Sequence, residues 1–304
     1  MDPSVVEALD AEGLRAVLPG FLSGFFTDND VRTANRQRVE TLVHSWSEAS
    51  VEGFLSTLQR DTSLFQSYPA SPAGRDLSRC WSRDAITHSE THGLEHLGEA
   101  AGQGPTVVLC THLSYFDASA TDAILAWSGH TDLADRLTFA AGPKVYQHLF
   151  RKVAATCLNT ILVPQSNALA HTDRISQREL AMRAIRSMKS ARDELDHGNI
   201  LLIYPEGTRS RDGTMGSFIK GVHRYLTLVP DTRVVPAFIA GTEHLMSVDH
   251  DERIQPGAVS LTFLPSLAVQ SKTEGRATLL ACRAQLEDSI PQVYRPLKEC
   301  PDWT

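Results

Sequence analysis

The sequence predicts an α/β fold in which helices flank a mixed sheet, preceded by a small helical domain. Beyond residue 100, short β-branched runs alternate with helical stretches, which is the pattern of strands joined by crossover helices. In the first seventy residues, apolar side chains recur instead at the 3.6-residue spacing of amphipathic helices. We therefore expect a helical domain over residues 1–70 and an α/β domain over residues 71–304.

Two helical patterns fill the first seventy residues. One runs from Val5 to Phe26, with a bend expected at Pro19-Gly20, and the other runs from about Val31 to Leu58. The segment from Tyr68 to Gly74 contains two prolines and a glycine, which interrupt regular structure. It is therefore the predicted boundary between the two domains.

Five apolar runs are predicted to be strands of the sheet. They cover residues 106–110, 161–163, 200–204, 234–239 and 259–263. The clearest helix runs from Glu179 to Asp196, because it is amphipathic and because His197-Gly198 is a good C-terminal stop. The strands lie far apart in the sequence, so helices must connect them.

Composition limits the classes of partner. The 304-residue chain is 42% hydrophobic and carries a formal net charge of −7, which gives no electrostatic reason to bind nucleic acid. No apolar run approaches the roughly 18 residues of a bilayer crossing, and the N-terminus does not read as a signal peptide. We expect a cytoplasmic protein. The Phe-rich first helix leaves peripheral membrane contact open as an alternative to bundle core, although Arg15 is its only basic residue.

Neither cysteines nor histidines predict a metal site. The five cysteines lack C-x-x-C spacing, so we expect reduced packing residues: Cys80, Cys110, Cys157, Cys282 and Cys300. His88, His92 and His96 would share one face of a helix. Gly93 weakens such a helix, and ordinary surface histidines are expected there.

Residues 111–117 form the first segment with chemical character, between a predicted strand and a helical run over residues 118–127. Corners of this kind are where α/β proteins place reactive groups. A carboxylate at Asp117 bonded to one nitrogen of His112 would fix the tautomer and leave the other nitrogen free to accept a proton. Among 12 histidines one chance His-x4-Asp match is unsurprising, and Asp117 could instead cap the helix.

A second segment, residues 204–211, also follows an apolar strand and reads Tyr-Pro-Glu-Gly-Thr-Arg-Ser-Arg. Guanidinium groups offer paired donors, so Arg209 and Arg211 beside free backbone amides suit a phosphate. The alternative is a solvated surface pair. Glu206, just past a buried strand, is harder to explain as a surface residue.

Together the two segments resemble the glycerolipid acyltransferases, which include lysophosphatidate acyltransferases and soluble plastid glycerol-3-phosphate acyltransferases. One hallmark of that family is a His-x-Ser-x-x-Asp block, matched here by His112, Ser114 and Asp117. The other is a downstream Glu-Gly-Thr-Arg-Ser block, matched by residues 206–210. The resemblance covers roughly residues 80–245, including weaker matches at 141–151 and 235–236, and two blocks in the right order make chance improbable.

The resemblance implies that His112 is the general base that deprotonates an acceptor hydroxyl, with Asp117 orienting it. The implied substrate-binding residues, of which the two arginines meet a phosphate, are Ser114, Glu206, Gly207, Thr208, Arg209 and Arg211. The implied co-substrate is an acyl-CoA or acyl-carrier-protein thioester, with no other cofactor, and the implied acceptor is glycerol 3-phosphate or 1-acylglycerol 3-phosphate. The chain has no Gly-x-Ser-x-Gly elbow, which agrees with direct transfer.

In one stretch the sequence departs from the family pattern. After the second strand the family tends to carry a basic residue that helps bind phosphate, whereas residues 163–168 hold none before His171. One alternative is therefore an acyltransferase of specialised lipid or natural-product synthesis with a phosphate-free acceptor. Another is a lipid carrier that has kept the fold, although an intact pair at His112 and Asp117 counts against it.

Overall fold

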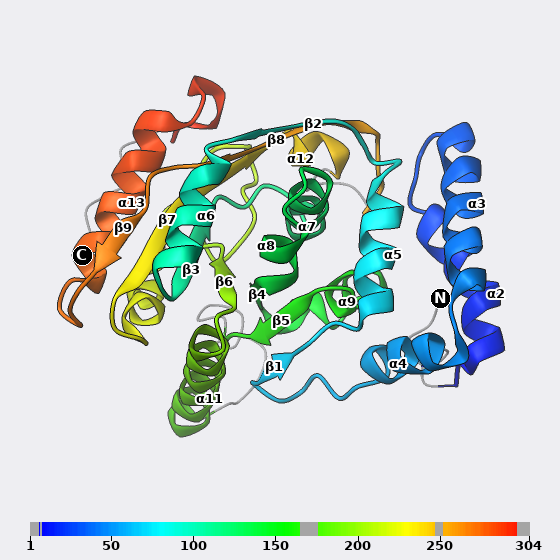
Figure 1. The fold of residues 1–304 in the computed structure, drawn as a ribbon, viewed down its shortest axis with the longest axis horizontal. Coiled ribbons are helices and arrows are strands. Elements are labelled where there is room, and N and C mark those ends of the chain that lie inside the picture. The colour runs from blue at the N-terminus through cyan, green and yellow to red at the C-terminus, as the bar shows by residue number, and fades with distance from the viewer. Residues whose placement is uncertain (1–5, 7, 165–175, 247–251, 297–304) are drawn as a thin grey trace.

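The computed structural model describes residues 6, 8–164, 176–246 and 252–296. In this part of the chain nine strands form one mixed sheet with the order β1-β5-β4-β6-β3-β7-β8-β2, and β9 pairs with β7 (Figure 1). The strands are β1 Ser67–Tyr68, β2 Ile86–His92, β3 Thr106–Cys110, β4 Leu137–Ala141, β5 Asn159–Leu162, β6 Ile200–Ile203, β7 Thr232–Ala240, β8 Gly257–Phe263 and β9 Leu267–Val269. The predicted mixed α/β fold is confirmed.

The centre of the sheet is parallel. Strands β5, β4, β6, β3 and β7 all run in one direction, whereas β1 and β9 are antiparallel to their partners and β8 is antiparallel to β7. Every residue of β3 and β6 is buried, because helices cover both faces, and this explains their unbroken apolar runs. The carboxyl ends of β3, β6 and β7 therefore meet at one edge of the sheet.

Helices cover the two faces of the sheet as separate layers. Those beyond the N-terminal region are α5 Pro72–Ser82, α6 Leu94–Gln103, α7 Asp117–Trp127, α8 Thr131–Arg136, α9 Leu149–Thr156, α11 Gln177–Asp196, α12 Thr242–Leu245 and α13 Gly275–Ser289, with 3-10 turns η1 Pro143–Val145, η2 Lys220–Thr227 and η3 Gln292–Tyr294. Side chains of β3 alternate between the two layers. Val108 and Cys110 pack in the core with α5, α6 and α7, and Val107 and Leu109 pack in the core with α11 and α13.

The N-terminal helices are α2 Ala11–Ser23, α3 Asn29–Ser45 and α4 Glu48–Leu58. The start of the first predicted helix lies outside the described residues, and α2 continues through Pro19. The second predicted helix is wrong as a single element, because Trp46 is extended and Ser47 caps a new helix by accepting a hydrogen bond from the Ser50 amide. The predicted helix at 179–196 is confirmed as α11, which ends at Asp196 and is followed by His197 and a left-handed Gly198.

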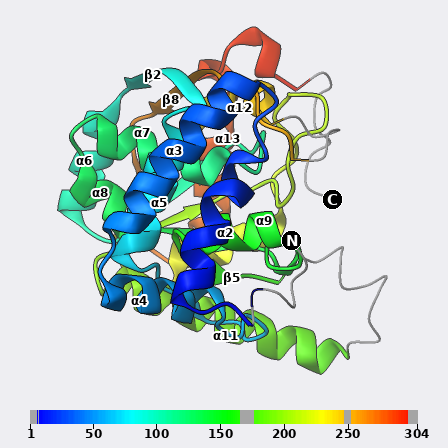
Figure 2. The ribbon, with the colours of Figure 1, turned by 90° about the vertical axis from the view of Figure 1, so that its right-hand side faces the viewer.

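One apolar core joins the N-terminal helices to the sheet. It contains Leu18 and Phe26 from the N-terminal region together with Val108 of β3 and Phe263 of β8. Figure 2 shows α2 and α3 packed as an outer layer over α5 and α9. The backbone of Phe26 forms a parallel bridge with Ile254. A domain division at residues 70/71 stays a prediction, since the packing is continuous across it.

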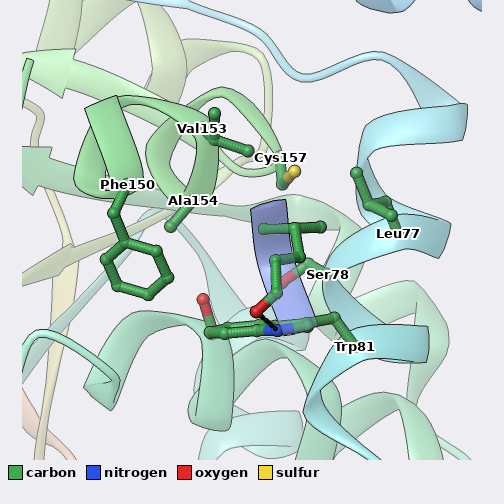
Figure 3. A pocket seen from close by; sticks show the side chains of 9 residues that line it. Leu77, Ser78, Trp81, Phe150, Val153, Ala154 and Cys157 are labelled. Atoms are coloured by element: carbon green, nitrogen blue, oxygen red, sulfur yellow. Dashed lines mark hydrogen bonds between the residues drawn. The ribbon is translucent and has the colours of Figure 1, made fainter. Parts of the chain in front are cut away.

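The packing between α2, α5 and α9 leaves one small gap. Its volume is about 10 Å³, room for no more than a water molecule. Figure 3 shows the side chains around it, among them Leu77 and Trp81 of α5, Phe150 of α9, and Cys157 directly after α9. The Trp81 indole N–H donates to the Leu22 carbonyl at 3.2 Å, which fixes α5 against α2.

Several elements differ from expectation. Strands β1, β2, β4 and β9 were not predicted. His88 and His92 lie in strand β2 with side chains 66% and 59% exposed, and α6 begins only at Leu94, so the three histidines do not share a helix face. Among the described residues, no group of three or more His, Cys, Asp and Glu side chains is placed to hold a metal ion, and no helix in this part of the chain is long and apolar enough to cross a membrane.

Candidate active site

The candidate site lies where β3, β6 and β7 end. His112 follows β3 by two residues, Tyr204 directly follows β6, and Gly241 directly follows β7. Because these three neighbouring strands are parallel, the loops after them converge at the carboxyl edge of the sheet. In open α/β sheets this edge is where ligands bind.

His112 and Asp117 form the predicted pair. His112 Nδ1 lies 2.8 Å from Asp117 Oδ2, and the histidine side chain is 16% exposed. The same carboxylate oxygen accepts the Leu113 and Ser114 amides at 2.8 and 3.0 Å, and Oδ1 accepts the Thr242 hydroxyl at 2.5 Å. With Nδ1 donating to Asp117, the Nε2 lone pair is free to accept a proton from a ligand.

Glu206 connects the two sequence blocks. Its Oε1 accepts the His112 amide at 3.0 Å, and its Oε2 accepts the Gly216 amide at 2.6 Å. The Ser210 amide in turn donates to the His112 carbonyl at 2.7 Å. Burial raises the pKa of the Glu206 carboxyl, partly offset by these amide donors. Glu206 thus holds the backbone of the histidine turn rather than facing an open pocket.

Gly207 and Thr208 follow this anchor. Gly207 has φ +67, and a β-carbon there would lie 2.1 Å from Ile219 Cδ1, so both its conformation and its packing favour glycine. The next side chain, Thr208, is exposed. Thr208 therefore presents its side chain to solvent at the edge of the site.

Tyr204 packs directly on the histidine. Its ring is stacked on the His112 imidazole, with centroids 4.1 Å apart and planes 16° apart. Its hydroxyl is buried and has no hydrogen-bond partner among the residues that the structure describes. Burial, with the Asp117 charge, raises the pKa of Tyr204 well above the ordinary value. The phenol is therefore neutral and restricts the imidazole ring from one face.

Two arginines gather around Tyr115, three residues beyond His112. The Arg209 guanidinium carbon lies 3.5 Å from the centroid of the Tyr115 ring, and that of Arg151 lies 4.4 Å from it. Arg151 Nη1 also donates to the Tyr115 hydroxyl at 3.0 Å, and Arg151 Nε donates to Glu252 Oε1 at 2.6 Å. We call Tyr115, Arg151 and Arg209 the arginine cluster; it can bind an anion beside the histidine.

The remaining predicted residues lie elsewhere. Ser114 is fully buried, where its hydroxyl donates to the Met246 carbonyl at 2.9 Å and accepts the Phe116 amide at 3.2 Å. It supports the turn, and its buried hydroxyl is not exposed at the edge of the site. Arg211 is exposed, and no contact in the described regions joins it to the arginine cluster. The stretch from residue 165 to His171 lies outside the described residues.

Cys110, the last residue of β3, is not a candidate nucleophile. It is fully buried, and burial together with the neighbouring carboxylates of Asp117 and Glu206 raises the pKa of its thiol well above the ordinary value. A thiol of this kind is inert. Cys110, Cys157 and Cys282 are buried free cysteines and Cys80 is half-buried, as predicted, whereas Cys300 lies outside the described residues.

Comparison with known proteins identifies the family. The family model described as Acyltransferase matches residues 88–240, about half of the chain. The chain belongs to the acyltransferase family. The matched residues include both sequence blocks and Arg151. The family resemblance that the sequence indicated is therefore confirmed.

Relatives of this acyltransferase-family chain include two proteins named 1-acyl-sn-glycerol-3-phosphate acyltransferase, from Limnanthes douglasii and Limnanthes alba. They are 39% and 38% identical over 108 residues, which is 35% of this chain and 37% of each relative. A protein of the same name from Chlamydomonas reinhardtii is 29% identical over 107 residues, 35% of this chain and 31% of the relative. The chain thus spans only about a third of the length of the curated relatives that it matches.

A solved structure supports the fold of this family member. The crystal structure of the 1-acyl-sn-glycerophosphate (LPA) acyltransferase PlsC from Thermotoga maritima superimposes with a TM-score of 0.50 and 15% sequence identity. The superposition covers 92% of this chain and 99% of the other. It bears on the architecture alone.

Reasoning from the sequence missed several residues of the site. Tyr115 and Tyr204 lie inside the segments that it singled out, and Arg151 ends one of the weaker matches. Thr242 directly follows Gly241 at the end of β7, and a search for polar residues just past each strand would have found it. Glu252 carries no sequence signal, because only the fold brings it to Arg151.

Proposed function

We propose that this protein transfers an acyl group from a thioester to a hydroxyl of 1-acylglycerol 3-phosphate or glycerol 3-phosphate. The observation that carries the proposal is a buried carboxylate 2.8 Å from Nδ1 of a histidine whose Nε2 has no hydrogen-bond partner among the described residues. Two arginines lie over the ring of Tyr115, three residues along the chain from that histidine. The names of the three relatives support the acceptor class. Membership in the acyltransferase family supports the reaction type.

In the proposed mechanism, His112 Nε2 removes the proton from the acceptor hydroxyl as its oxygen attacks the thioester carbonyl carbon. The C–O bond forms, the tetrahedral intermediate collapses, and the C–S bond breaks. The imidazolium then returns the proton to the leaving sulfur, so the products are an ester and a free thiol. Asp117 stabilises the imidazolium and fixes the ring, as in other His-Asp pairs.

The arginine cluster would hold the acceptor. A phosphate bound by Arg209 and Arg151 would place the rest of a glycerol backbone within reach of the histidine, since Tyr115 is only three residues from His112. Binding energy at the phosphate then contributes to positioning of the hydroxyl. The donor is an acyl thioester of coenzyme A or of a carrier protein, and these share the reacting group.

The test is product detection by mass spectrometry. Purified protein is supplied with acyl-CoA and acyl-carrier-protein donors, and with glycerol 3-phosphate, 1-acylglycerol 3-phosphate and phosphate-free alcohols together. We expect acylation of a phosphorylated acceptor, and a loss on the order of a thousandfold in His112→Ala. Acylation of phosphate-free alcohols alone would overturn the acceptor, and an unimpaired His112→Ala variant would overturn the mechanism.

A further inference from the structure

One acidic residue, Glu252, lies against the arginine cluster. Arg151 Nε donates to Glu252 Oε1 at 2.6 Å, and the two side chains are only 11% and 21% exposed. By contrast, the pair between Lys189 and Asp193 on α11 spans 3.2 Å with side chains 77% and 51% exposed. Short, partly buried ion pairs are strong charge-assisted contacts, whereas exposed pairs contribute little. Glu252 is therefore a strong ion-pair partner of Arg151.

The charges of the cluster are incompletely balanced. Two guanidinium groups lie at one tyrosine ring, 3.5 and 4.4 Å from its centroid, and Glu252 supplies a single negative charge to Arg151. Throughout the described ranges no carboxylate lies within ion-pair distance of Arg209. The cluster thus keeps one positive charge, and a dianion such as a phosphate monoester would meet both a guanidinium that is ready to bind and a carboxylate that repels it.

The position of Glu252 is set by the backbone around it. Its φ of +56 lies in the left-handed region, which residues with a β-carbon rarely adopt. Two residues later, the Ile254 amide donates to the Phe25 carbonyl at 2.8 Å, and the Ile254 carbonyl accepts the Thr27 amide at 3.0 Å. These bonds attach the segment that carries Glu252 to the connection between α2 and α3.

We propose that Glu252 determines acceptor specificity by occupying, beside Arg151, the position that the acceptor phosphate takes. This inference rests on the proposed function. A phosphorylated acceptor must displace the Glu252 carboxylate from Arg151, so its affinity is lower than two free arginines would give. An acceptor without phosphate leaves the pair intact and gains nothing from its removal.

The test is Glu252→Gln, which removes the charge and keeps the shape of the side chain. Isothermal titration with glycerol 3-phosphate, and separately with inorganic phosphate, should show binding tighter by on the order of tenfold. The Michaelis constant for a phosphorylated acceptor should fall by a similar factor with little change in kcat. Glu252→Ala is the second variant and should act in the same direction.

Glu48→Gln is the matched control. Glu48 pairs with Arg15 at 2.9 Å in the N-terminal helices, so this change removes one carboxylate charge from an arginine partner away from the cluster, and should leave phosphate affinity unchanged. Equal or weaker phosphate binding by both folded Glu252 variants would overturn the inference while leaving the proposed acceptor standing. If neither parent nor variants bind either anion, the phosphorylated acceptor and the role of Glu252 both fall.

Discussion

At the scale of single residues, the Asp117 carboxylate is the most constrained group of the site. It is fully buried and accepts four hydrogen bonds, three at Oδ2 and one at Oδ1. A carboxylate is stable in the interior only when hydrogen-bond donors reach its oxygen atoms. Each of these donors therefore also fixes the orientation of the Asp117 carboxylate toward His112. Thr242 is the one donor that comes from a distant part of the chain.

Thr242 is therefore predicted to position the pair. Thr242→Val keeps the shape but removes the donor to Asp117 Oδ1, and we expect kcat to fall about tenfold with the Michaelis constants nearly unchanged. Thr242→Ser, which restores the hydroxyl, should recover most of the rate. Steady-state kinetics of both variants check this. A Thr242→Val variant as fast as the parent would show that three donors are enough.

Arg209 is predicted to bind the acceptor phosphate in ground and transition states alike. Arg209→Ala should then raise the Michaelis constant for a phosphorylated acceptor more than it lowers kcat. Arg211→Ala is a matched control, because Arg211 is exposed and no described contact joins it to the cluster. An unchanged Michaelis constant in Arg209→Ala would assign Arg209 to the solvated surface.

Glu206 gives a pH dependence of defined sign. Burial raises the pKa of this carboxyl above the ordinary value of 4.5, so the protonated form is favoured in the folded protein. Its contribution to stability is complete below pH 4.5 and is lost as the pH rises through the folded-state pKa. The stability advantage of the parent over Glu206→Gln should therefore be larger near about pH 4 than near pH 7. Denaturant unfolding at both pH values measures it, and an advantage that grows with pH would contradict the assignment.

The sequence predicted part of this residue-scale picture. His112, Asp117, Glu206 and Arg209 were identified because their blocks are local and match a known family. Glu206 proved to be an anchor of the histidine turn, a role that depends on a hydrogen bond across 94 residues of sequence. Contacts of this kind leave no pattern in a local segment, which is also why Glu252 escaped notice.

At the scale of elements, short connections decide where reactive side chains point. Gly241 joins β7 to α12 with φ +95, and a β-carbon there would lie 2.2 Å from the Ala258 carbonyl oxygen of β8. Backbone oxygen atoms in a sheet cannot move aside easily. The turn therefore requires glycine, and it sets the position of Thr242.

Gly241→Ala should lower the free energy of unfolding by roughly 3 kcal/mol or more, since it combines backbone strain with overpacking. It should also reduce activity through Thr242. Gly98→Ala is the control, because Gly98 lies inside α6 with no atom within 4 Å of an added β-carbon, and should stabilise by about 1 kcal/mol. Denaturant unfolding compares the two. A Gly241→Ala variant as stable as the parent would mean that the turn can adopt another conformation.

Element prediction failed where periodicity was not the deciding signal. The break between α3 and α4 occupies two residues, so the apolar spacing runs through it, and only the cap at Ser47 marks it. Strand β2 reads Ile-Thr-His-Ser-Glu-Thr-His and exposes most of its side chains at an edge of the sheet. Strands β3 and β6 were found because burial on both faces makes them continuously apolar, whereas the central strand β4 was missed.

At the scale of the whole molecule, the N-terminal helices and the sheet share one core. Phe26 is fully buried against Trp81, with ring centroids 6.2 Å apart, and its backbone pairs with Ile254. Phe26→Ala should lower the free energy of unfolding by about 3–5 kcal/mol. Because the packing is continuous, we expect a single unfolding transition, with coincident midpoints by tryptophan fluorescence and far-ultraviolet circular dichroism. Two separated transitions would show instead that residues 1–70 unfold on their own.

The strand order has a consequence for how the chain reaches this structure. Strands β1 and β2 are near neighbours in the sequence but form opposite edges of the sheet, and β2 pairs with β8, which is made about 170 residues later. During synthesis β2 therefore stays unpaired until β8 has been made. Loop closure over such distances makes folding slow. The exposed polar side chains of β2 then reduce the risk that this strand, while still unpaired, forms a sheet with another chain.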